Sequence, residues 1–142
     1  MNSRLDEMQA EFLNVKLNYI EKFTNERIDI AKKYSDGLFG IDELVLPHVN
    51  IGSTHVYHIY LIRTDKRDEL AIHLQNCGIG SLIHYPLPPH LQEAYQELHY
   101  KEGDFPLAEK IAETCLSLPL YPGLRDDQID YVVRSVRSFF SY

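Results

Sequence analysis

The most constraining feature of the sequence is a helical pattern that runs from residue 3 to residue 36 without a glycine or a proline. An unbroken helix of about 35 residues would be roughly 50 Å long, whereas a globule of this chain length is roughly 35–40 Å across. Such a helix must project from its domain. Its apolar residues recur at steps of three and four, as in an amphipathic helix. They are Leu5, Met8, Phe12, Val15, Tyr19, Ile28, Ala31, Tyr34 and Leu38.

Two arrangements of this helix fit the pattern. In the first, the helix projects and a partner or another domain covers its apolar stripe, because large exposed apolar patches mark interfaces. In the second, the helix bends near Asn25 and folds back as a hairpin. The hairpin is the less favoured arrangement, since no glycine or proline lies there. Ser3, followed three residues later by Asp6, is the expected N-terminal cap.

Composition and charge exclude several classes of protein. A content of 44% hydrophobic and 25% charged residues is that of an ordinary globular protein and excludes a disordered or collagen-like chain. A net charge of −7 disfavours binding to nucleic acid or to an anionic membrane surface. No apolar run approaches the about 20 residues that span a bilayer, and the charged N-terminus does not resemble a signal peptide. With only two cysteines and no disulfide framework, the expected location is the cytoplasm.

Beyond residue 38 the pattern predicts an α+β fold, in which a small antiparallel or mixed sheet of about three strands packs with helices. Strands are expected at residues 55–64, which are rich in Val, Ile and Tyr, and at 79–85 and 116–121. Pro119 confines the last of these to an edge of the sheet or an irregular end.

Helices are expected to alternate with these strands. Their start and stop signals are short polar residues, which cap helix N-termini, and a glycine, which ends a helix in the left-handed conformation. These signals are Asp65 and Gly78 for the first helix and Asp104 for a later one, and the last helix is expected to open at Asp126 and Asp127. Cys77 and Cys115 fall on the inward faces of their predicted helices and are expected to be core residues rather than nucleophiles.

The densest cluster of reactive side chains is HYPLPPH at residues 84–90, where a predicted strand enters a loop. His84, Tyr85 and His90 could serve there as acids, bases or hydrogen-bond donors. From the residue chemistry alone, the favoured reading is that both histidines are half-buried and that the prolines shape a turn. A metal site is not expected, because neither this pair of histidines nor His55 with His58 has the spacing of a metal site.

The chain resembles the C-terminal part of the DegT/DnrJ/EryC1/StrS aminotransferases, which are pyridoxal-phosphate enzymes that aminate keto sugars. The resemblance covers nearly the whole chain through the following segments, in this order: NSRLDEMQAEFLNVKL, RIDIAKKYSDGL, HVYHIYLIRT, RDELAIHLQNCGIGSLIHYPLPPHLQEAY, GDFPLAEKIAETCLSLPLYPGL and DQIDYVVRSVRSFF. The most specific segments look closest to the dTDP-3-keto-6-deoxyhexose 3-aminotransferases.

The resemblance implies a division of the chain into a long interdomain and dimerisation helix, residues 1–38, and a small α+β domain, residues 39–142. The family's large domain, which carries the Schiff-base lysine, is absent from these residues. None of the seven lysines is assigned that role, so no catalytic residue is expected here. We therefore expect a fragment or a truncated reading frame that is inactive alone and binds no pyridoxal phosphate by itself.

The resemblance also implies roles for five residues. Asn2 and Arg4 match the G-x-N-x-R motif that reaches into the neighbouring subunit and binds the cofactor phosphate, although the glycine is missing here and Met1 precedes Asn2. Simple capping by this polar start of the helix is the ordinary alternative. His84, Tyr85 and His90 match a stretch near the active-site mouth that is a candidate for contacts with the sugar nucleotide.

The implied partners are a second copy of the chain in a homodimer, a sugar nucleotide and an amino donor, which is expected to be glutamate. Nucleic acid and membrane are not expected as partners. The alternative function is a stand-alone, non-enzymatic binding or regulatory module that has the same fold. A third and weaker alternative is a metal enzyme built on His84 and His90.

Overall fold

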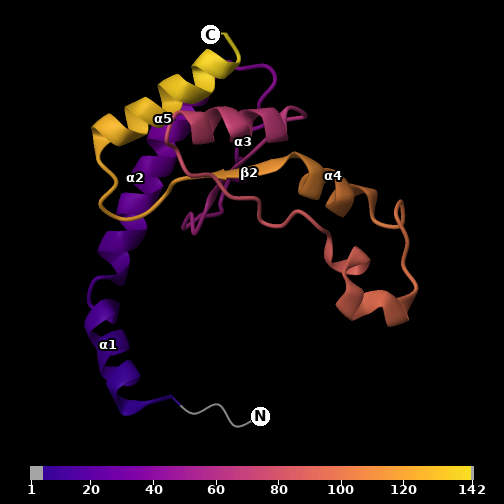
Figure 1. Ribbon diagram of the computed structural model, residues 1–142. Coiled ribbons are helices and arrows are strands. Elements are labelled where there is room, and N and C mark those ends of the chain that lie inside the picture. Colours follow the sequence, from indigo (N-terminus) through magenta and orange to yellow (C-terminus); the bar gives the residue numbers. More distant parts are fainter. Residues whose placement is uncertain (1–4, 142) are drawn as a thin grey trace.

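The N-terminal helical pattern forms two consecutive helices, α1 (Glu7–Leu17) and α2 (Ile20–Leu38). The structure is a computed structural model that describes residues 5–141 (Figure 1). The backbone amide of Met8 donates to the Asp6 carboxylate at 2.8 Å, so Asp6 is itself the N-cap of α1, whereas the sequence pattern placed Asp6 three residues after the cap. Ser3 lies outside the described residues.

The helical axis breaks at Asn18 and Tyr19, and not near Asn25, where the less favoured alternative placed a bend. The amide of Tyr19 donates to the carbonyl of Lys16 at 3.0 Å, a tight three-residue turn that ends α1. Tyr19 then precedes α2 and accepts from the amide of Phe23 at 3.0 Å. Asn25 lies inside α2, so no hairpin forms.

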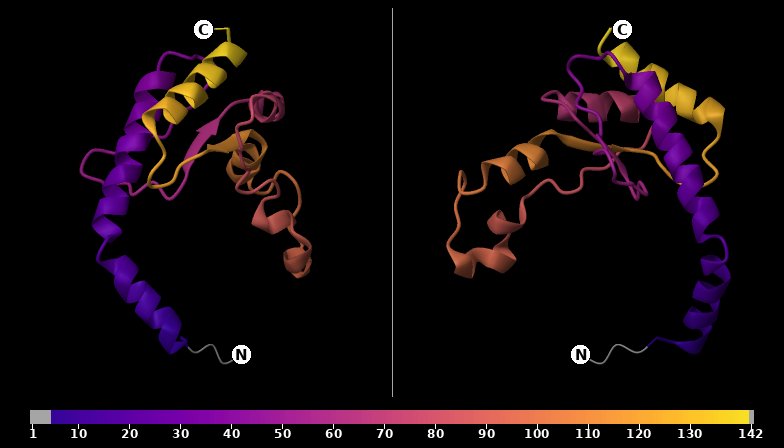
Figure 2. Two further views of the ribbon diagram at one scale, coloured as in Figure 1. Left: turned by 60° about the vertical axis from the view of Figure 1, so that its left-hand side comes forward. Right: turned by 180° about the vertical axis from the view of Figure 1, so that it is seen from behind.

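α1 projects from the rest of the molecule, as the two further views make clear (Figure 2). None of its residues is buried. Its apolar side chains are between 54% and 68% exposed, so the structure has the projecting arrangement rather than the hairpin. These side chains, with Leu5 just before the helix, are Leu5, Met8, Phe12, Leu13, Val15 and Leu17.

The sheet is antiparallel and consists of two strands, β1 (Tyr60–Arg63) and β2 (Cys115–Leu118). One isolated bridge extends it on each side, from Val45 to β1 and from Leu82 to β2. The predicted strand at 79–85 is therefore wrong apart from Leu82. The strand at 55–64 is shorter than predicted, and β2 ends where Pro119, which has no N–H group, follows Leu118.

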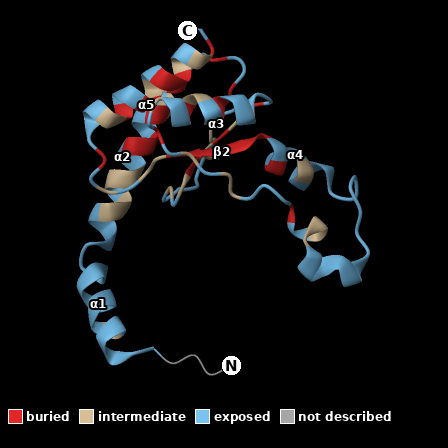
Figure 3. Ribbon diagram, viewed as in Figure 1, coloured by how far each residue is buried: buried red, intermediate tan, exposed pale blue. Residues whose placement is uncertain are grey.

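Helices α2, α3 (Arg67–Asn76) and α5 (Asp126–Phe139) surround the core on one side of the sheet (Figure 3). Alternate strand residues point into this core, as the period of a strand requires. The fully or almost fully buried side chains include Tyr34, Tyr60, Ile62, Leu70, Leu74, Leu116 and Val136. The α+β class predicted from the sequence is confirmed.

The second face of the sheet has buried β2 residues at its centre, Cys115 and Ser117, and exposed apolar side chains at its margins. Opposite residues of an antiparallel pair share a face, so Leu61 lies beside Ser117 and Leu82 there. Leu82 is 65% and Val45 51% exposed, and a hollow of about 540 Å³ lies against Val45 and Leu61. We call this surface the open sheet face.

A second arm leaves the core after the Leu82 bridge and returns through α4 (Pro106–Thr114). It contains two short 3-10 helices, η1 (Pro89–Leu91) and η2 (Glu93–Leu98). In all three views, this arm and α1 extend to the same side of the core, away from α3 and α5 (Figures 1 and 2). None of the helices formed by residues 5–141 combines the length and apolar character of a membrane span.

Two of the predicted helix caps are wrong, because each carboxylate has another partner. Asp65 pairs with Lys110 at 2.6 Å, and α3 begins after Lys66 without a side-chain cap. Asp104 accepts from the amide of Lys101 at 2.7 Å instead of capping α4. The left-handed Gly78, at φ 73°, and the start of α5 at Asp126 agree with the prediction.

Candidate functional site

The structure places the sequence-predicted site residues in two separate surroundings. His84 and Tyr85 follow the Leu82 bridge at the edge of the sheet, whereas His90 lies in η1 on the second arm. Each histidine has its own polar partner, and no hydrogen bond joins the two within residues 5–141. Asn2 and Arg4 lie outside the described residues.

His84 is held by β2. Its Nδ1 lies 2.9 Å from Oγ of Ser117, a residue that is only 5% exposed. The backbone of Ser117 also pairs with Leu82 in both directions, at 2.8 and 3.2 Å. The Sγ of Cys115, two residues earlier in β2, lies 3.9 Å from the carbonyl oxygen of His84. The sheet thus fixes both the main chain and the ring of His84.

Tyr85 is turned outward beside this histidine. It is 72% exposed, and its ring meets the His84 ring edge-on at a centroid distance of 5.7 Å. Its hydroxyl makes no hydrogen bond with residues 5–141 in the structure. The pair therefore presents an imidazole and a free phenol at the margin of the open sheet face.

His90 belongs to a buried polar cluster in the second arm. Its Nε2 lies 2.9 Å from Oε1 of Glu109, and the two side chains are 8% and 15% exposed. The Glu109 carboxylate also accepts from the amides of Gly103 and Phe105. The Gly103 amide above all, together with His90 and Phe105, lowers the pKa of Glu109 below its ordinary value. This cluster ties both ends of the arm to α4.

An apolar cavity of about 350 Å³ lies beside this cluster. The ring of His90 forms part of its wall and packs against Phe105 at a centroid distance of 4.9 Å. The remaining lining residues are mostly large and apolar, and they are Pro89, Tyr95, Leu98, Tyr100, Phe105 and Ala108. The cavity offers almost no polar group besides the histidine, so it is suited to an apolar surface rather than to a charged ligand.

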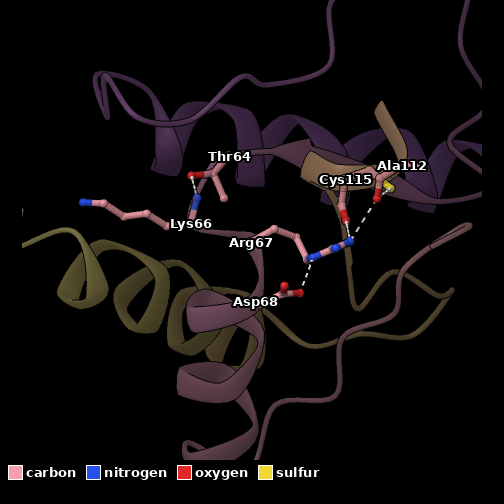
Figure 4. Close-up of polar contacts among 6 residues, drawn as sticks. All are labelled: Thr64, Lys66, Arg67, Asp68, Ala112 and Cys115. Carbon is pink, nitrogen blue, oxygen red and sulfur yellow. Dashed lines mark hydrogen bonds and ion pairs between the residues drawn. The ribbon is translucent and has the colours of Figure 1, made fainter. Parts of the chain in front are cut away.

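Arg67 connects α3 to α4 and β2, a role that no sequence pattern indicated (Figure 4). Its side chain is only 12% exposed, and it donates to the carbonyl oxygens of Ala112 at 3.1 Å and Cys115 at 3.4 Å. These carbonyls lie at the junction of α4 and β2. Arg67, the first residue of α3, therefore holds that junction against α3. The neighbouring Lys66 turns away and pairs with Glu43 at 2.6 Å.

All seven lysines are exposed. Two of them have a pKa above the ordinary value, because Lys66 bonds Glu43 and Lys110 bonds Asp65. An amine that reacts as a nucleophile needs the opposite, a lowered pKa in a desolvated site. Residues 5–141 also contain no group of three or more His, Cys, Asp or Glu side chains that could hold a metal ion.

The family model for the DegT/DnrJ/EryC1/StrS aminotransferases matches residues 1–137. A pleiotropic regulatory protein of Geobacillus stearothermophilus is 44% identical over 143 residues, which cover 99% of this chain and 38% of that protein. The dTDP-3-amino-3,4,6-trideoxy-alpha-D-glucose transaminase of Streptomyces venezuelae is 41% identical over 138 residues, with coverage of 97% and 36%.

Solved structures agree with these sequence matches. The crystal structure of DesV from Streptomyces venezuelae superposes with a TM-score of 0.97 at 39% identity and covers 100% of this chain, but only 38% of DesV. The chain thus spans just over a third of the length of the relatives that it matches. It belongs to the DegT/DnrJ/EryC1/StrS aminotransferase family and has the fold of the C-terminal small domain of these enzymes.

Proposed function

We propose that this chain is the C-terminal small domain of a cytoplasmic, pyridoxal-phosphate-dependent aminotransferase that acts on nucleotide-linked keto sugars in amino-sugar or polysaccharide biosynthesis. The observation that carries the proposal is the match to the family over residues 1–137. Relatives named as transaminases of dTDP-linked 3-amino sugars match at 41% and 35% identity, which supports this substrate class. Glutamate is the proposed amino donor, and a homodimer is the proposed assembly.

Two surfaces support the proposal that residues 1–38 join a large domain to the small domain of residues 39–142. One is α1, which has no buried residue although six apolar side chains lie on or beside it. The other is the open sheet face with Leu61 and Leu82. Both would be unusual on the free surface of a monomer. α1 extends to the same side of the core as the second arm, which leaves the sheet beside Leu82 (Figures 1 and 2). One large domain could therefore cover the two surfaces together.

The cofactor requires residues that the described part of the chain does not supply. Pyridoxal phosphate provides the amino-transfer chemistry in this family and is linked there to a lysine. The lysines of this chain are exposed, and Lys66 and Lys110 are held in the charged form by carboxylates. Residues 5–141 therefore do not fit a complete cofactor site. We propose that the large domain holds the cofactor and that Asn2 and Arg4 bind its phosphate across the dimer.

His84 and Tyr85 are the proposed contacts with the sugar nucleotide. Both lie at the margin of the open sheet face, and the phenol of Tyr85 is free to donate or accept a hydrogen bond. For His90 we propose an indirect part, because its Nε2 is already bound to Glu109. It would hold the second arm in place at the mouth of the site.

A chimeric enzyme tests this function. The part of the Streptomyces venezuelae transaminase that matches this chain is replaced by the chain itself, and transamination of a dTDP-linked keto sugar is assayed. We expect activity from the chimera and none from the 142-residue chain alone. Phe12→Glu should abolish assembly and activity, whereas the control Gln9→Glu, which adds the same charge to α1, should leave both unchanged. A folded, dimeric chimera without activity would contradict the proposal.

A second candidate is a binding or regulatory module that has this fold and no enzymatic activity. It is favoured by the name of the relative that is 44% identical, a pleiotropic regulatory protein. An inactive chimera, combined with a stable complex between the isolated chain and a cellular protein that Phe12→Glu disrupts, would favour this candidate. Saturable trapping of pyridoxal phosphate by borohydride on a single lysine of the isolated chain would exclude both readings.

A further inference from the structure

We propose that Ser117 is a positioning residue that fixes the imidazole of His84, so that Nε2, as an N–H donor, is presented to an oxygen of the sugar nucleotide. The inference rests on the proposed function, because Ser117 would orient the ring of His84 for the proposed contact with the sugar nucleotide. The first observation is the distance of 2.9 Å between Oγ of Ser117 and Nδ1 of His84.

The strand geometry explains why one segment holds the histidine at several points. Cys115 and Ser117 are two residues apart in β2, so their side chains point to the same face of the sheet. One contacts the carbonyl oxygen of His84 and the other its ring. The backbone of Ser117 also pairs with Leu82. Rotation of the ring would therefore break a contact to a residue that the sheet holds rigidly.

The burial of Ser117 decides which group donates. The residue is 5% exposed, and a buried hydroxyl proton needs an acceptor. The only hydrogen-bond partner of Oγ within residues 5–141 is Nδ1 of His84. If Nδ1 carried the proton, the hydroxyl would accept from the ring and its own proton would have no acceptor there. The hydroxyl therefore donates to Nδ1, and the neutral ring carries its proton on Nε2.

The consequence is a ring with one occupied and one available nitrogen. Nε2 of His84 makes no hydrogen bond with the described residues, while Nδ1 is bound to Ser117. An N–H group at the margin of the open sheet face suits a ligand rich in oxygen, such as the phosphate or hydroxyl groups of a sugar nucleotide. Fixing this donor before the ligand binds lowers the entropic cost of the contact.

The first test determines the tautomer of His84 in the 142-residue chain by long-range nitrogen–proton NMR correlation at a pH where the ring is neutral. We expect an unprotonated Nδ1 and a protonated Nε2. Ser117→Ala should give a mixture of tautomers, and Ser117→Thr, which keeps the hydroxyl, should restore the single form. The control Ser81→Ala removes a neighbouring half-buried hydroxyl and should change nothing. A protonated Nδ1 in the wild-type chain would overturn the proposal, even if Ser117→Ala failed to fold.

The second test uses dTDP-glucose as the probe. Its addition should shift the Nε2 resonance of His84, and Ser117→Ala should raise the dissociation constant about tenfold, as expected for one lost hydrogen bond, with Ser117→Thr close to the wild type. No shift in the wild-type chain, despite the expected tautomer, would count against the sugar-nucleotide role of His84 and leave the fixing of the ring by Ser117 intact. Equal affinity of the wild-type and Ser117→Ala chains would overturn the positioning role.

Discussion

A methyl group added at Gly37 would lie 2.8 Å from Cγ1 of Val133, so α2 and α5 approach more closely here than a side chain at Gly37 permits. The same contact brings the end of α2 within reach of α5. The guanidinium of Arg137 donates to the carbonyl oxygen of Gly37 at 2.8 Å and to that of Phe39 at 3.3 Å. Because the last carbonyls of a helix lack partners within it, this arginine satisfies them.

Gly37→Ala is expected to lower the free energy of unfolding by about 1 kcal/mol. Overpacking in a core destabilises the fold by about 1–3 kcal/mol, whereas alanine in place of glycine stabilises a helix by about 0.5–1 kcal/mol. Urea denaturation measures the change. In the Val133→Ala background the clash is absent, so the same substitution should be neutral or stabilising. Gly80→Ala, where an added methyl group meets nothing within 4 Å, is the control. Additive effects of the two substitutions would contradict the close contact.

The helices were predicted well wherever local sequence decides their ends. Gly78 adopts the expected left-handed conformation and α5 begins at the expected Asp126. The caps failed where a distant residue competes for the carboxylate, as Lys110 does for Asp65 across 45 positions. A pattern of local signals cannot show such a competitor, because the fold brings it there.

The sheet and the site were harder to predict for the same reason. Residues 79–85 have the composition of a strand, but only Leu82 pairs with Ser117 before the chain leaves the core as the second arm. The sequence showed that His84 and His90 are clustered along the chain. Their partners, Ser117 and Glu109, lie 33 and 19 positions away, so spacing along the chain could not indicate which side chain holds each imidazole ring.

Arg67→Met is expected to lower the free energy of unfolding by about 2 kcal/mol. The substitution keeps an apolar side chain of similar length, but it leaves the carbonyl oxygens of Ala112 and Cys115 without their charged donor, and hydrogen bonds to charged groups contribute about 1.5–3 kcal/mol. Lys66→Met is the control, because the pair that Lys66 forms with Glu43 is exposed and should contribute little. Equal effects of the two substitutions in urea denaturation would count against a structural role of Arg67.

The buried tyrosine pair should make the fold sensitive to alkaline pH. The rings of Tyr34 and Tyr60 lie 5.2 Å apart. Burial raises the pKa of Tyr60 from 10.0 to about 12 and that of Tyr34 still further above the ordinary value. Because the pKa of Tyr60 is higher in the folded state than in the unfolded state, its neutral phenol stabilises the fold fully below pH 10.0, the unfolded pKa. This stabilisation is lost as pH rises through the folded pKa of about 12.

Urea denaturation at a series of alkaline pH values tests this expectation. The free energy of unfolding of the wild-type chain should fall steadily above about pH 10. Tyr60→Phe removes the hydrogen bond to Ser35, so it should lower the free energy of unfolding at neutral pH. It also removes one titrating group, so the free energy of unfolding should fall less steeply with pH in the alkaline range. Tyr85→Phe, at an exposed position, should keep the wild-type slope. If all three chains shared one slope, the buried pair would not be the cause.

Glu109→Gln should loosen the second arm without unfolding the core. The carboxylate accepts hydrogen bonds from the amides of Gly103 and Phe105 and contacts His90, and a neutral amide can replace these interactions only in part. Hydrogen exchange of the Gly103 and Phe105 amides should therefore become faster, whereas exchange in β2 stays slow. Glu113→Gln, an exposed position in the same helix, is the matched control.

The same substitution should remove an acid sensitivity of the arm. Because the pKa of Glu109 in the folded state lies below 4.5, its stabilisation is present above pH 4.5 and is lost as pH falls through the folded value. In the wild-type chain, protection of the Gly103 amide should decrease over that acidic range, but in Glu109→Gln it should be low and independent of pH there. Protection that fell equally in both chains would mean that other carboxylates control the arm, and His90 would then lose its proposed part in holding it.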